Sequence, residues 1–475
     1  MQAEVFDMVV VGSGPAGQQA AAQAARLGKR VLVIEKQREV GGECVHRGTI
    51  PSKTLRETTV ALRRFPERTG GVFPLATPDH LQVASLMGRM HEVIRGHEAM
   101  IATQLEREGV TVWHGHASLA DPHTLRVVRP GGQPERWARG RFIVLATGSR
   151  PRVPDNVPVD HEHILDSDSL LSMLYLPRSL AVLGGGVIAC EYASIFAALG
   201  VQVTLIAREA LPLRWMDPEL SRRFVRAFEA MGGAFLGDRH IDAVSWDGVR
   251  VATTALRGGE QVHTEKVLCA LGRVANLNRL QIDAAGLTTT RRGHLEVDAH
   301  CRTTAAPHIY AVGDVIGPPA LAATSMEQGR RAARHAFGLD SPARFGIIPA
   351  GIYAVPEMSM IGLTEQEAID AHGGVTVGRA SFSEVARGLI ANIPDGFLKI
   401  VADPSGRRLL GAHIIGEGAT ELIHLAQMAL IQEADVDLFV EQTFNFPTLA
   451  EAYRAAALQI VAQRRARSTP ERACA

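Results

Sequence analysis

A glycine-rich turn near the start of the 475-residue chain has the composition of a nucleotide-binding loop. Gly12, Gly14 and Gly17 form the pattern G-x-G-x-x-G, and Glu35 ends the next apolar run, followed by Lys36. In such a turn the first glycine permits the tight bend, the second lets the backbone approach a pyrophosphate, and the third lets a helix pack closely. A carboxylate at Glu35 would accept hydrogen bonds from a ribose. These residues predict a dinucleotide site.

The same pattern recurs later in the chain with the same internal spacing. The three equivalent positions are Gly184, Gly186 and Ala189. Ala207 corresponds to Glu35, and two arginines follow it, Arg208 and Arg214. A carboxylate would repel a 2′-phosphate, whereas arginine binds one through charge-assisted hydrogen bonds. The second turn is therefore expected to bind NADPH and to admit NADH. The alternative is that both arginines are solvated surface charges, since Glu209 lies beside them.

The turns must be positioned by strands and helices of the same kind. An apolar strand precedes each turn, and a helix and a second strand follow: 5–11, 18–27 and 31–34, then 179–183, a helix that follows Ala189 and runs to Leu199, and 201–206. One other apolar strand ends at Thr147 and Gly148, and another ends at Gly272 and Arg273. A third ends at Asp314, and a helix is expected after it over 320–337. Carboxyl ends of parallel strands share one edge of a sheet, so these residues are expected beside bound cofactors. The alternative role for Asp314 is a helix cap.

The composition shows no excess of either charge. Lys plus Arg and Asp plus Glu each number 50, which argues against a nucleic-acid-binding protein. Five cysteines are scattered without a C-x-x-C pair, so no metal site is expected. The apolar stretch 178–200 contains Glu191 and three consecutive glycines, which argues against a membrane span. The amino terminus lacks the pattern of a signal peptide, so a cytoplasmic location is expected.

Residues 41–53 carry the most specific pattern in the sequence. Their sequence is GGECVHRGTIPSK, and the informative positions are Gly42, Cys44, Thr49 and Lys53. This segment resembles the redox loop of the FAD-dependent pyridine nucleotide–disulfide oxidoreductases, which carries C-x-x-x-x-C before I-P-S-K. Cys44 matches the first cysteine, whereas Thr49 takes the place of the second. Because a disulfide needs both sulfurs, this loop cannot form one.

The carboxyl-terminal tail departs from the disulfide reductases in the same respect. In that family a His-Pro-Thr motif brings a general base to the dithiol from the partner subunit, but residues 446–448 here are Phe-Pro-Thr. Phe446 cannot accept a proton. The loop and residues 443–454 resemble one branch of the family, the soluble pyridine nucleotide transhydrogenases. The resemblance implies reversible hydride transfer between NADPH and NAD⁺ through bound FAD, in a homodimer or larger homo-oligomer.

The element pattern and the resemblance together predict an α/β fold with two Rossmann-like dinucleotide-binding domains and a carboxyl-terminal α+β dimerisation domain. The expected FAD-binding domain comprises residues 1–150 and 275–345, and the NAD(P)-binding domain comprises 151–274. Residues 346–468 would form the dimerisation domain, and 469–475 a disordered tail.

The resemblance also implies roles for the matching positions. The expected FAD-binding residues are Gly12, Gly14, Gly17, Glu35, Lys36, Gly42, Cys44, Lys53, Ala117, Thr147, Gly148, Asp314 and Ala322. The expected NADP(H)- and NAD(H)-binding residues are Gly184, Gly186, Ala189, Glu191, Arg208, Arg214, Gly272 and Arg273. Lys53 and Glu191 are expected to pair near flavin N5 and to be catalytic, because a cation there stabilises the reduced flavin. One nicotinamide site would serve both nucleotides in turn, which predicts ping-pong kinetics.

Three other functions stay open at this point. An FAD-dependent NAD(P)H oxidase or quinone reductase would use the same first half-reaction with another oxidant. A disulfide reductase would need a second thiol, for which Cys474 in the tail is the candidate. A non-enzymatic flavoprotein would sense NAD(P)H through its conformation. Cys44 itself is either a thiolate against the flavin or a buried relic that packs as a small apolar group.

Overall fold

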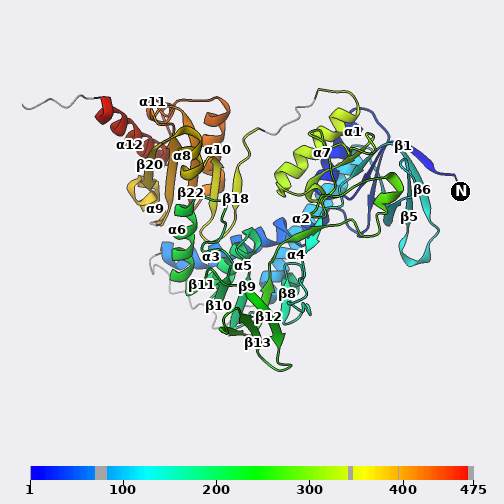
Figure 1. Ribbon diagram of the computed structural model, residues 1–475, viewed down its shortest axis with the longest axis horizontal. Coiled ribbons are helices and arrows are strands. Elements are labelled where there is room, and N and C mark those ends of the chain that lie inside the picture. The colour runs from blue at the N-terminus through cyan, green and yellow to red at the C-terminus, as the bar shows by residue number, and fades with distance from the viewer. Residues whose placement is uncertain (1, 70–82, 341–345, 394, 469–475) are drawn as a thin grey trace, which may run out of the picture.

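The computed structural model describes residues 2–69, 83–340, 346–393 and 395–468. Three parts are distinct in Figure 1: a first α/β unit at the right, a second below it, and a carboxyl-terminal domain at the upper left. No helix of these described residues has the length and apolar character needed to cross a membrane.

The first unit is built on a mostly parallel sheet. Its parallel strands are β1 (Glu4–Val11), β2 (Val31–Glu35), β3 (Thr111–His114), β6 (Arg136–Leu145) and β17 (Ile309–Ala311). The order is β3-β2-β1-β6-β5-β4, where β4 (His116–Leu119) and β5 (Thr124–Val128) are antiparallel and β17 pairs with β6. The strand interiors are continuous apolar runs because helices cover them. Two helices that lie against each other, α1 (Pro15–Arg26) and α7 (Ala322–Ala336), belong to this unit.

The second unit repeats this architecture on a smaller scale. Its parallel sheet has the order β11-β10-β9-β15-β8. These strands are β8 (Ile164–Asp166), β9 (Ser179–Leu183), β10 (Gln202–Ile206), β11 (Ala234–Leu236) and β15 (Lys266–Cys269), with helices α5 (Val187–Ala198) and α6 (Pro218–Ala230). An antiparallel sheet of β12 (Ile241–Trp246), β13 (Ala252–Leu256) and β14 (Gln261–Thr264) lies beside it. The antiparallel pair β7 (Ser149–Pro151) and β16 (Arg273–Ala275) lies where the chain passes between the two units.

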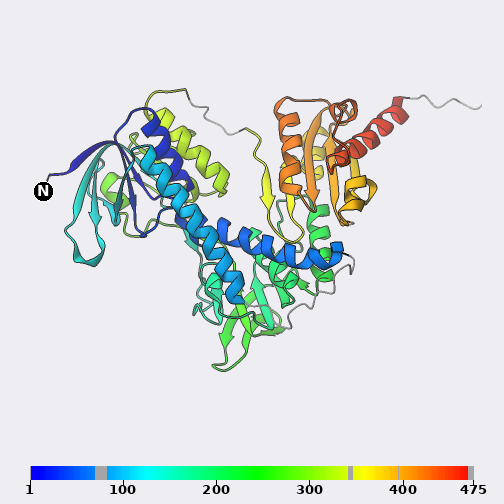
Figure 2. The same cartoon turned by 180° about the vertical axis from the view of Figure 1, so that it is seen from behind.

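Three helices and several short turns complete the two units. They are α2 (Gly42–His46), α3 (Thr49–Thr69) and α4 (Val83–Arg107), and Figure 2 shows the two long ones crossing the middle of the molecule. Helix α3 packs against both α4 and α5, so the segment that begins at Thr49 touches both nucleotide units. Short 3₁₀ turns span Pro130–Gly132, Ser169–Ser172, Ile282–Ala285 and Gly313–Ile316 in these units, and Phe382–Glu384 in the carboxyl-terminal domain.

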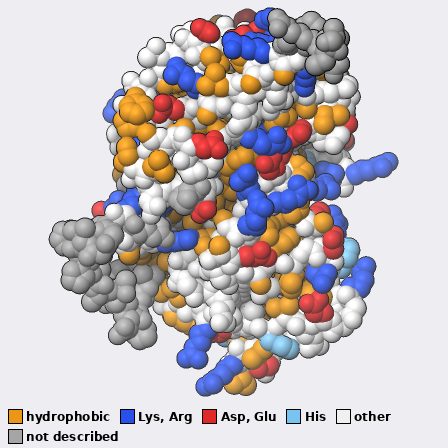
Figure 3. Space-filling view, turned by 90° about the vertical axis from the view of Figure 1, so that its left-hand side faces the viewer, with side chains coloured by type: hydrophobic (Ala, Val, Ile, Leu, Met, Phe, Trp, Pro, Cys, Tyr) orange, Lys and Arg blue, Asp and Glu red, His pale blue; other side chains and the backbone are white. Residues whose placement is uncertain are grey.

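The carboxyl-terminal domain is an antiparallel sheet with helices, as the change in sequence pattern predicted. Its strand order is β18-β19-β22-β21-β20. The strands are β18 (Ala350–Ile352), β19 (Met358–Gly362), β20 (Thr376–Ser381), β21 (Phe397–Ala402) and β22 (Leu409–Ile415). The helices are α8 (Glu365–His372), α9 (Ala386–Ile390), α10 (Ala419–Ile431), α11 (Leu438–Glu441) and α12 (Glu451–Ser468). Figure 3 looks onto the end of the molecule that carries α9 and α12, where hydrophobic side chains lie exposed among charged ones.

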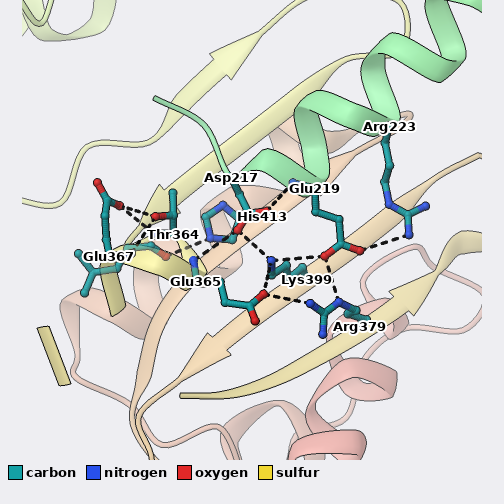
Figure 4. A network of polar contacts seen from close by, with 10 residues as sticks. Asp217, Glu219, Arg223, Thr364, Glu365, Glu367, Arg379, Lys399 and His413 are labelled. Carbon is teal, nitrogen blue, oxygen red and sulfur yellow. Dashed lines mark hydrogen bonds and ion pairs between the residues drawn. The ribbon is translucent and has the colours of Figure 1, made fainter. Parts of the chain in front are cut away.

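A buried ion cluster joins the second unit to the carboxyl-terminal domain (Figure 4). Asp217, the N-cap of α6, accepts a hydrogen bond from Lys399 Nζ at 2.8 Å, and both side chains are at most 2% exposed. Lys399 also lies 2.6 Å from Glu365 Oε2 and 3.3 Å from Glu219 Oε2. Arg379 closes the cluster by bonding the same two glutamates, each at 3.0 Å. The start of α6 is therefore fixed to the sheet of the neighbouring domain.

Candidate nucleotide-binding and active site

A single cavity of about 1350 Å³ runs along the facing edges of both α/β units. Most of the residues predicted from sequence line it: Gly12, Gly14, Glu35, Lys36, Gly42, Cys44, Lys53, Ala117, Thr147, Gly148, Asp314, Ala322, Gly184, Gly186, Glu191, Arg208, Gly272 and Arg273. Gly17, Ala189 and Arg214 are not among the lining residues. The cavity joins the two predicted nucleotide sites into one continuous space.

The two glycine turns have the same geometry. Gly12 has φ +103° and a Cβ there would lie 2.4 Å from the Ala146 carbonyl oxygen. Gly184 has φ +122° and its Cβ would lie 2.5 Å from the Ala270 carbonyl oxygen. Gly17 lies beneath the first turn, because a Cβ at this position would lie 1.9 Å from the Gly12 carbonyl oxygen. Ala189, fully buried, occupies the corresponding place in the second unit.

Several helices begin at the cavity, among them α1, α5 and α7. Gly14 and Gly186 are the N-caps of α1 and α5, and neither helix has a side chain capping its first turn. A Cβ added to either glycine would meet no protein atom within 4 Å. Helix α7 also starts there, at Ala322. Free N–H groups and the positive end of the helix dipole favour an anionic ligand at such positions.

Glu35 is buried, and its carboxylate stabilises the first turn through hydrogen bonds. Its Oε2 accepts hydrogen bonds from the Ser13 backbone N–H at 2.8 Å and from Ser13 Oγ at 2.7 Å. Its Oε1 accepts from the Gln37 N–H at 2.9 Å. The second unit has Gly185 and Ala207 at the equivalent positions, and a Cβ on Gly185 would lie 3.1 Å from Ala207 Cβ. The second site therefore lacks both members of this polar pair.

A hydrogen-bonded chain connects the middle of the cavity to the strand pair between the two units. Ser149 Oγ donates to Asp314 Oδ2 at 2.6 Å. Arg273 donates to Ser149 Oγ from Nε at 2.7 Å and to the Ser149 carbonyl from Nη2 at 2.8 Å. Thr147 Oγ1 is buried and has no hydrogen-bond partner in the described part of the protein. Sequence reasoning missed Ser149, because pairing of β7 with β16 brings it to Arg273.

The structure brings Lys53 and Glu191 together. Lys53 Nζ lies 2.9 Å from Glu191 Oε1 and 2.8 Å from Oε2, and the Glu191 side chain is 5% exposed. Glu191 Oε1 also accepts the Tyr353 backbone N–H at 2.9 Å. The Lys53 ammonium lies 4.9 Å from the centre of the Tyr353 ring, within the range of a cation–π contact. Tyr353, from the carboxyl-terminal domain, was not predicted as a site residue.

Cys44 lies in the cavity wall beside Thr49 rather than beside a second thiol. Burial raises the pKa of the Cys44 thiol, more than the hydrogen bond with Thr49 and the charge of Lys53 lower it. The raised pKa disfavours the thiolate, which favours the packing role over the thiolate role. Three other cysteines are buried and free: Cys190, Cys269 and Cys301. Cys474, the candidate for a second thiol, lies outside the described residues.

Acidic and phenolic groups in the cavity wall were not predicted from sequence. Burial, followed by the negative charge of Glu43, raises the pKa of Asp168 to about 6. Glu43 Oε2 and the Tyr192 hydroxyl are buried without a hydrogen-bond partner among the described residues. All three residues line the cavity. Their positions follow from tertiary packing of α2, α5 and the turn after β8, so no short motif identifies them.

Two arginines lie at the far end of the second unit, each paired with a glutamate. Arg208 lines the cavity and its Nη2 lies 3.0 Å from Glu209 Oε1. Arg239 and His240 also line the cavity and were not predicted. Arg214 is exposed and lies outside the lining. Across the described part of the chain, no group of three or more His, Cys, Asp or Glu side chains could hold a metal ion.

The comparisons with family models match nearly the whole chain. Residues 6–329 match the model described as pyridine nucleotide-disulphide oxidoreductase, and residues 348–457 match its dimerisation domain. The chain belongs to the pyridine nucleotide-disulphide oxidoreductase family. The resemblance deduced from residues 41–53 and from the tail is confirmed, as is the prediction of two dinucleotide-binding units followed by a third domain. The dimerisation domain indicates homo-oligomerisation.

Curated relatives within this family share the full length of the chain. A protein of Mycobacterium tuberculosis named soluble pyridine nucleotide transhydrogenase is 41% identical over 461 residues, covering 97% of this chain and 98% of its own. One of the same name from Hahella chejuensis is 39% identical over 458 residues, covering 95% and 97%.

Solved structures of the family have the same fold. LpdA of Mycobacterium tuberculosis superposes with a TM-score of 0.87 at 26% identity, covering 96% of this chain and 99% of that one. The HOCl-induced flavoprotein disulfide reductase RclA of Escherichia coli gives 0.85 at 25% identity, covering 95% and 99%. Family members therefore include proteins named for disulfide chemistry and proteins named for hydride exchange between nucleotides.

In this family member, the position expected to hold a general base is occupied by an exposed apolar side chain. Phe446 precedes α12 and is 75% exposed in the single chain. The nearby helices also expose apolar side chains, including Met428 on α10 and Leu458 on α12. Phe446 and Met428 lie in the segment 348–457 that matches the dimerisation domain, and Leu458 directly follows it.

Proposed function

We propose that this protein is an FAD-dependent NAD(P)⁺ transhydrogenase that transfers hydride reversibly between NADPH and NAD⁺. The observation that carries the proposal is the combination of two nucleotide turns on one cavity with a redox loop that holds one cysteine and a threonine, Cys44 and Thr49. The names of the full-length relatives support it. Hydride exchange between nucleotides requires neither a thiol pair nor a base at Phe446.

The residues of the first unit fit FAD. The space above Gly14 and the N-termini of α1 and α7 suit a pyrophosphate, and the buried Thr147 hydroxyl lacks a protein partner. Glu35, Lys36 and Ala117 line the end of the cavity expected for the adenosine, and Gly148 and Asp314 line its middle. When bound, FAD supplies the group that accepts a hydride from one nucleotide and returns it to another.

The side chains of the protein position the bound groups and place charge in the cavity. Lys53 places a positive charge in the cavity and is held there by both oxygens of Glu191. Tyr353 fixes Glu191 through its backbone N–H, so the carboxyl-terminal domain helps to orient the pair. Such preorganised charge stabilises the negative charge that a hydride brings to the site. The second unit binds NADP(H) and NAD(H) in turn, with Gly184, Gly186 and Gly272 close to the nucleotide.

The proposal includes a homodimer or larger homo-oligomer formed through the carboxyl-terminal domain, and a cytoplasmic location. The dimerisation-domain match and the exposed apolar groups on α10 and α12 support self-association. Sedimentation of the purified protein measures the oligomer directly, and cell fractionation measures the location.

An anaerobic assay tests the activity. Purified FAD-loaded protein is mixed with NADPH and thionicotinamide-NAD⁺, and the absorbance of the reduced thio-analogue is followed. Appearance of the reduced analogue in step with NADPH loss is the expected result. Oxidation of NADPH by added quinone or oxygen, with no reduced analogue formed, would overturn the proposal in favour of an oxidase or quinone reductase. Flavin that is not bleached by NADPH would overturn the nucleotide assignment and favour a sensor.

A further inference from the structure

Two arginines of the second unit lie at the same end of the cavity, and each is paired with a carboxylate. Arg208 follows β10, and its Nη2 lies 3.0 Å from Glu209 Oε1. Arg239 follows β11, and its Nε donates to Glu260 Oε2 at 2.9 Å. Both arginines line the cavity, while their side chains remain 66% and 40% exposed. Sequence spacing suggests Arg208, but Arg239 comes to the site through the fold.

The backbone holds these two segments side by side. The Arg239 N–H donates to the Ala207 carbonyl at 2.9 Å, and the Asp238 N–H donates to the Glu209 carbonyl at 3.2 Å. Arg239 Nη1 donates to the Gly237 carbonyl at 3.3 Å, which limits where the guanidinium can move. Arg239 is therefore anchored beside Ala207, the position that corresponds to the ribose-binding carboxylate of the first unit.

The second unit carries an uncharged side chain, Ala207, where the first unit has the carboxylate of Glu35. The first unit has a buried carboxylate at this place, held by Ser13. In the second unit Ala207 has no carboxylate of its own, and the nearest one is Glu209, whose Oε2 would lie 4.0 Å from a Cβ on Gly185 and which pairs with Arg208. The guanidinium groups of Arg208 and Arg239 line the same end of the cavity. A 2′-phosphate on the adenosine ribose would meet both arginines, and guanidinium binds phosphate in a bidentate, charge-assisted manner.

We propose that Arg239 and Arg208 together bind the 2′-phosphate of NADP(H), and that Glu209 and Glu260 are the partners these arginines keep when NAD(H) is bound. The inference rests on the proposed function in one respect, the assignment of the second unit to both nucleotides. Exposed ion pairs are weak, so a phosphate dianion displaces them readily. When the nucleotide lacks a 2′-phosphate, neither guanidinium is left unpaired. One site can then use both nucleotides in turn, as transhydrogenation requires.

A pair of small ligands isolates the phosphate contact in the FAD-loaded protein. 2′,5′-ADP and 5′-AMP differ by the 2′-phosphate, and calorimetry measures their binding without any hydride transfer. Arg239→Gln is expected to weaken 2′,5′-ADP binding about tenfold, as loss of a charged hydrogen-bonding partner does. It should leave 5′-AMP binding unchanged. Arg239→Lys should recover part of the loss, and Glu260→Gln should strengthen 2′,5′-ADP binding by freeing Arg239.

Arg222→Gln is the matched control, because Arg222 lies exposed on α6 of the same unit and outside the cavity lining. It should bind both ligands as the unchanged protein does. Equal affinity of Arg239→Gln and the unchanged protein for 2′,5′-ADP would overturn the role of Arg239. Equal affinity of the unchanged protein for 2′,5′-ADP and 5′-AMP would overturn the phosphate site altogether. If neither ligand binds, the nucleotide assignment itself fails, which separates failure of the proposed function from failure of this inference.

Discussion

At the scale of single residues, Lys53 combines a sequence motif with a defined geometry. It follows the loop in which Thr49 replaces a cysteine, and its ammonium is held by both oxygens of a nearly buried glutamate, Glu191. The same glutamate is held by a backbone N–H from Tyr353. A charge fixed in this way needs no reorganisation when hydride arrives, which is the condition for electrostatic stabilisation.

Substitution of Lys53 by glutamine should therefore slow the chemical step more than nucleotide binding. The rate at which saturating NADPH bleaches the bound flavin is expected to fall about 10²–10³-fold, the size found for other electrostatic groups. Anaerobic stopped-flow absorbance measures this rate. Lys29→Gln is the control, because Lys29 lies over the Phe337 ring and does not line the cavity. An unchanged bleaching rate in Lys53→Gln would remove Lys53 from the mechanism.

Asp168 predicts how nucleotide affinity depends on pH. Its pKa is raised to about 6, so it is mostly ionised at pH 7.5 and mostly protonated at pH 5. The ionised form repels an anionic nucleotide in the same cavity, so the affinity for NAD⁺ should rise several-fold as pH falls through 6. NAD⁺ is the probe because a 2′-phosphate titrates in the same range. Asp168→Asn should bind NAD⁺ with little pH dependence; an unchanged pH profile in this variant would exclude Asp168 as the cause.

The sequence motifs identified the cavity residues that lie in the glycine turns or at the ends of strands. The glycine turns, Glu35, Asp314 and the Lys53 loop were all found from sequence, because each lies next to the end of a predicted strand or in a recognisable motif. Asp168, Arg239 and Tyr353 were not, since each reaches the cavity from a segment outside the motifs. Ser149 directly follows Gly148 but was missed, because its role depends on its contacts with Asp314 and Arg273 in the folded chain. Arg214 shows the converse, because it lies near a motif in sequence but is exposed and outside the cavity lining.

At the scale of elements, two glycines in one turn have separable roles. Gly17 lies under the turn, where a Cβ would lie 1.9 Å from the Gly12 carbonyl oxygen, whereas a Cβ on Gly14 meets open space in the cavity. The first position serves the packing of α1 on β1, and the second serves access to the ligand. The motif assigns the same two roles from sequence, and the close packing at Gly17 and the open space at Gly14 agree with them.

Alanine at each of these positions should give a different defect. Gly17→Ala is expected to lower the thermal midpoint of unfolding, because the helix and the turn must move apart. Gly14→Ala should leave the midpoint of the flavin-free protein nearly unchanged and reduce the flavin retained per chain after gel filtration. Calorimetry and the ratio of absorbance at 450 and 280 nm measure the two effects. The same loss of midpoint in both variants would contradict the assignment.

At the scale of the whole molecule, the two nucleotide units and the carboxyl-terminal domain depend on one another. The buried cluster around Lys399 ties α6 to the domain's sheet, and Tyr353 from that domain reaches the Lys53–Glu191 pair. The element pattern predicted the order of the units along the chain, because the local apolar periodicity of the sequence determines this order. The element pattern did not predict these contacts between domains. Each contact depends on side chains that are far apart in sequence and meet only after the domains have packed.

Breaking the buried cluster should destabilise the protein at neutral pH. Lys399→Met leaves the Asp217 carboxylate buried without its cation, a change that costs about 3–5 kcal/mol. Arg379→Met, at the more exposed edge of the same cluster, should cost below about 1 kcal/mol. Adding Asp217→Asn to Lys399→Met should recover part of the loss. Urea unfolding at pH 7 measures the free energy of unfolding of the unchanged protein and of the three variants. Equal losses of stability in Lys399→Met and Arg379→Met would contradict the account.

The pH of that measurement matters because of Asp217. Burial raises the pKa of Asp217, but the hydrogen bond from Lys399 and nearby positive charges outweigh burial, so the pKa is lowered overall. The folded form thus binds this proton less tightly than the unfolded chain does. The stabilisation is fully present above the ordinary pKa of about 4 and is lost as pH falls through the folded value.

The central claim is that one cavity passes hydride between two nucleotides that occupy the same site in turn. Anaerobic initial rates measured over a matrix of NADPH and thionicotinamide-NAD⁺ concentrations test it most directly. The account predicts parallel lines in a double-reciprocal plot, with substrate inhibition at high concentrations of either nucleotide. Intersecting lines would show that both nucleotides are bound together, and the absence of any reduced thio-analogue would contradict transhydrogenation itself.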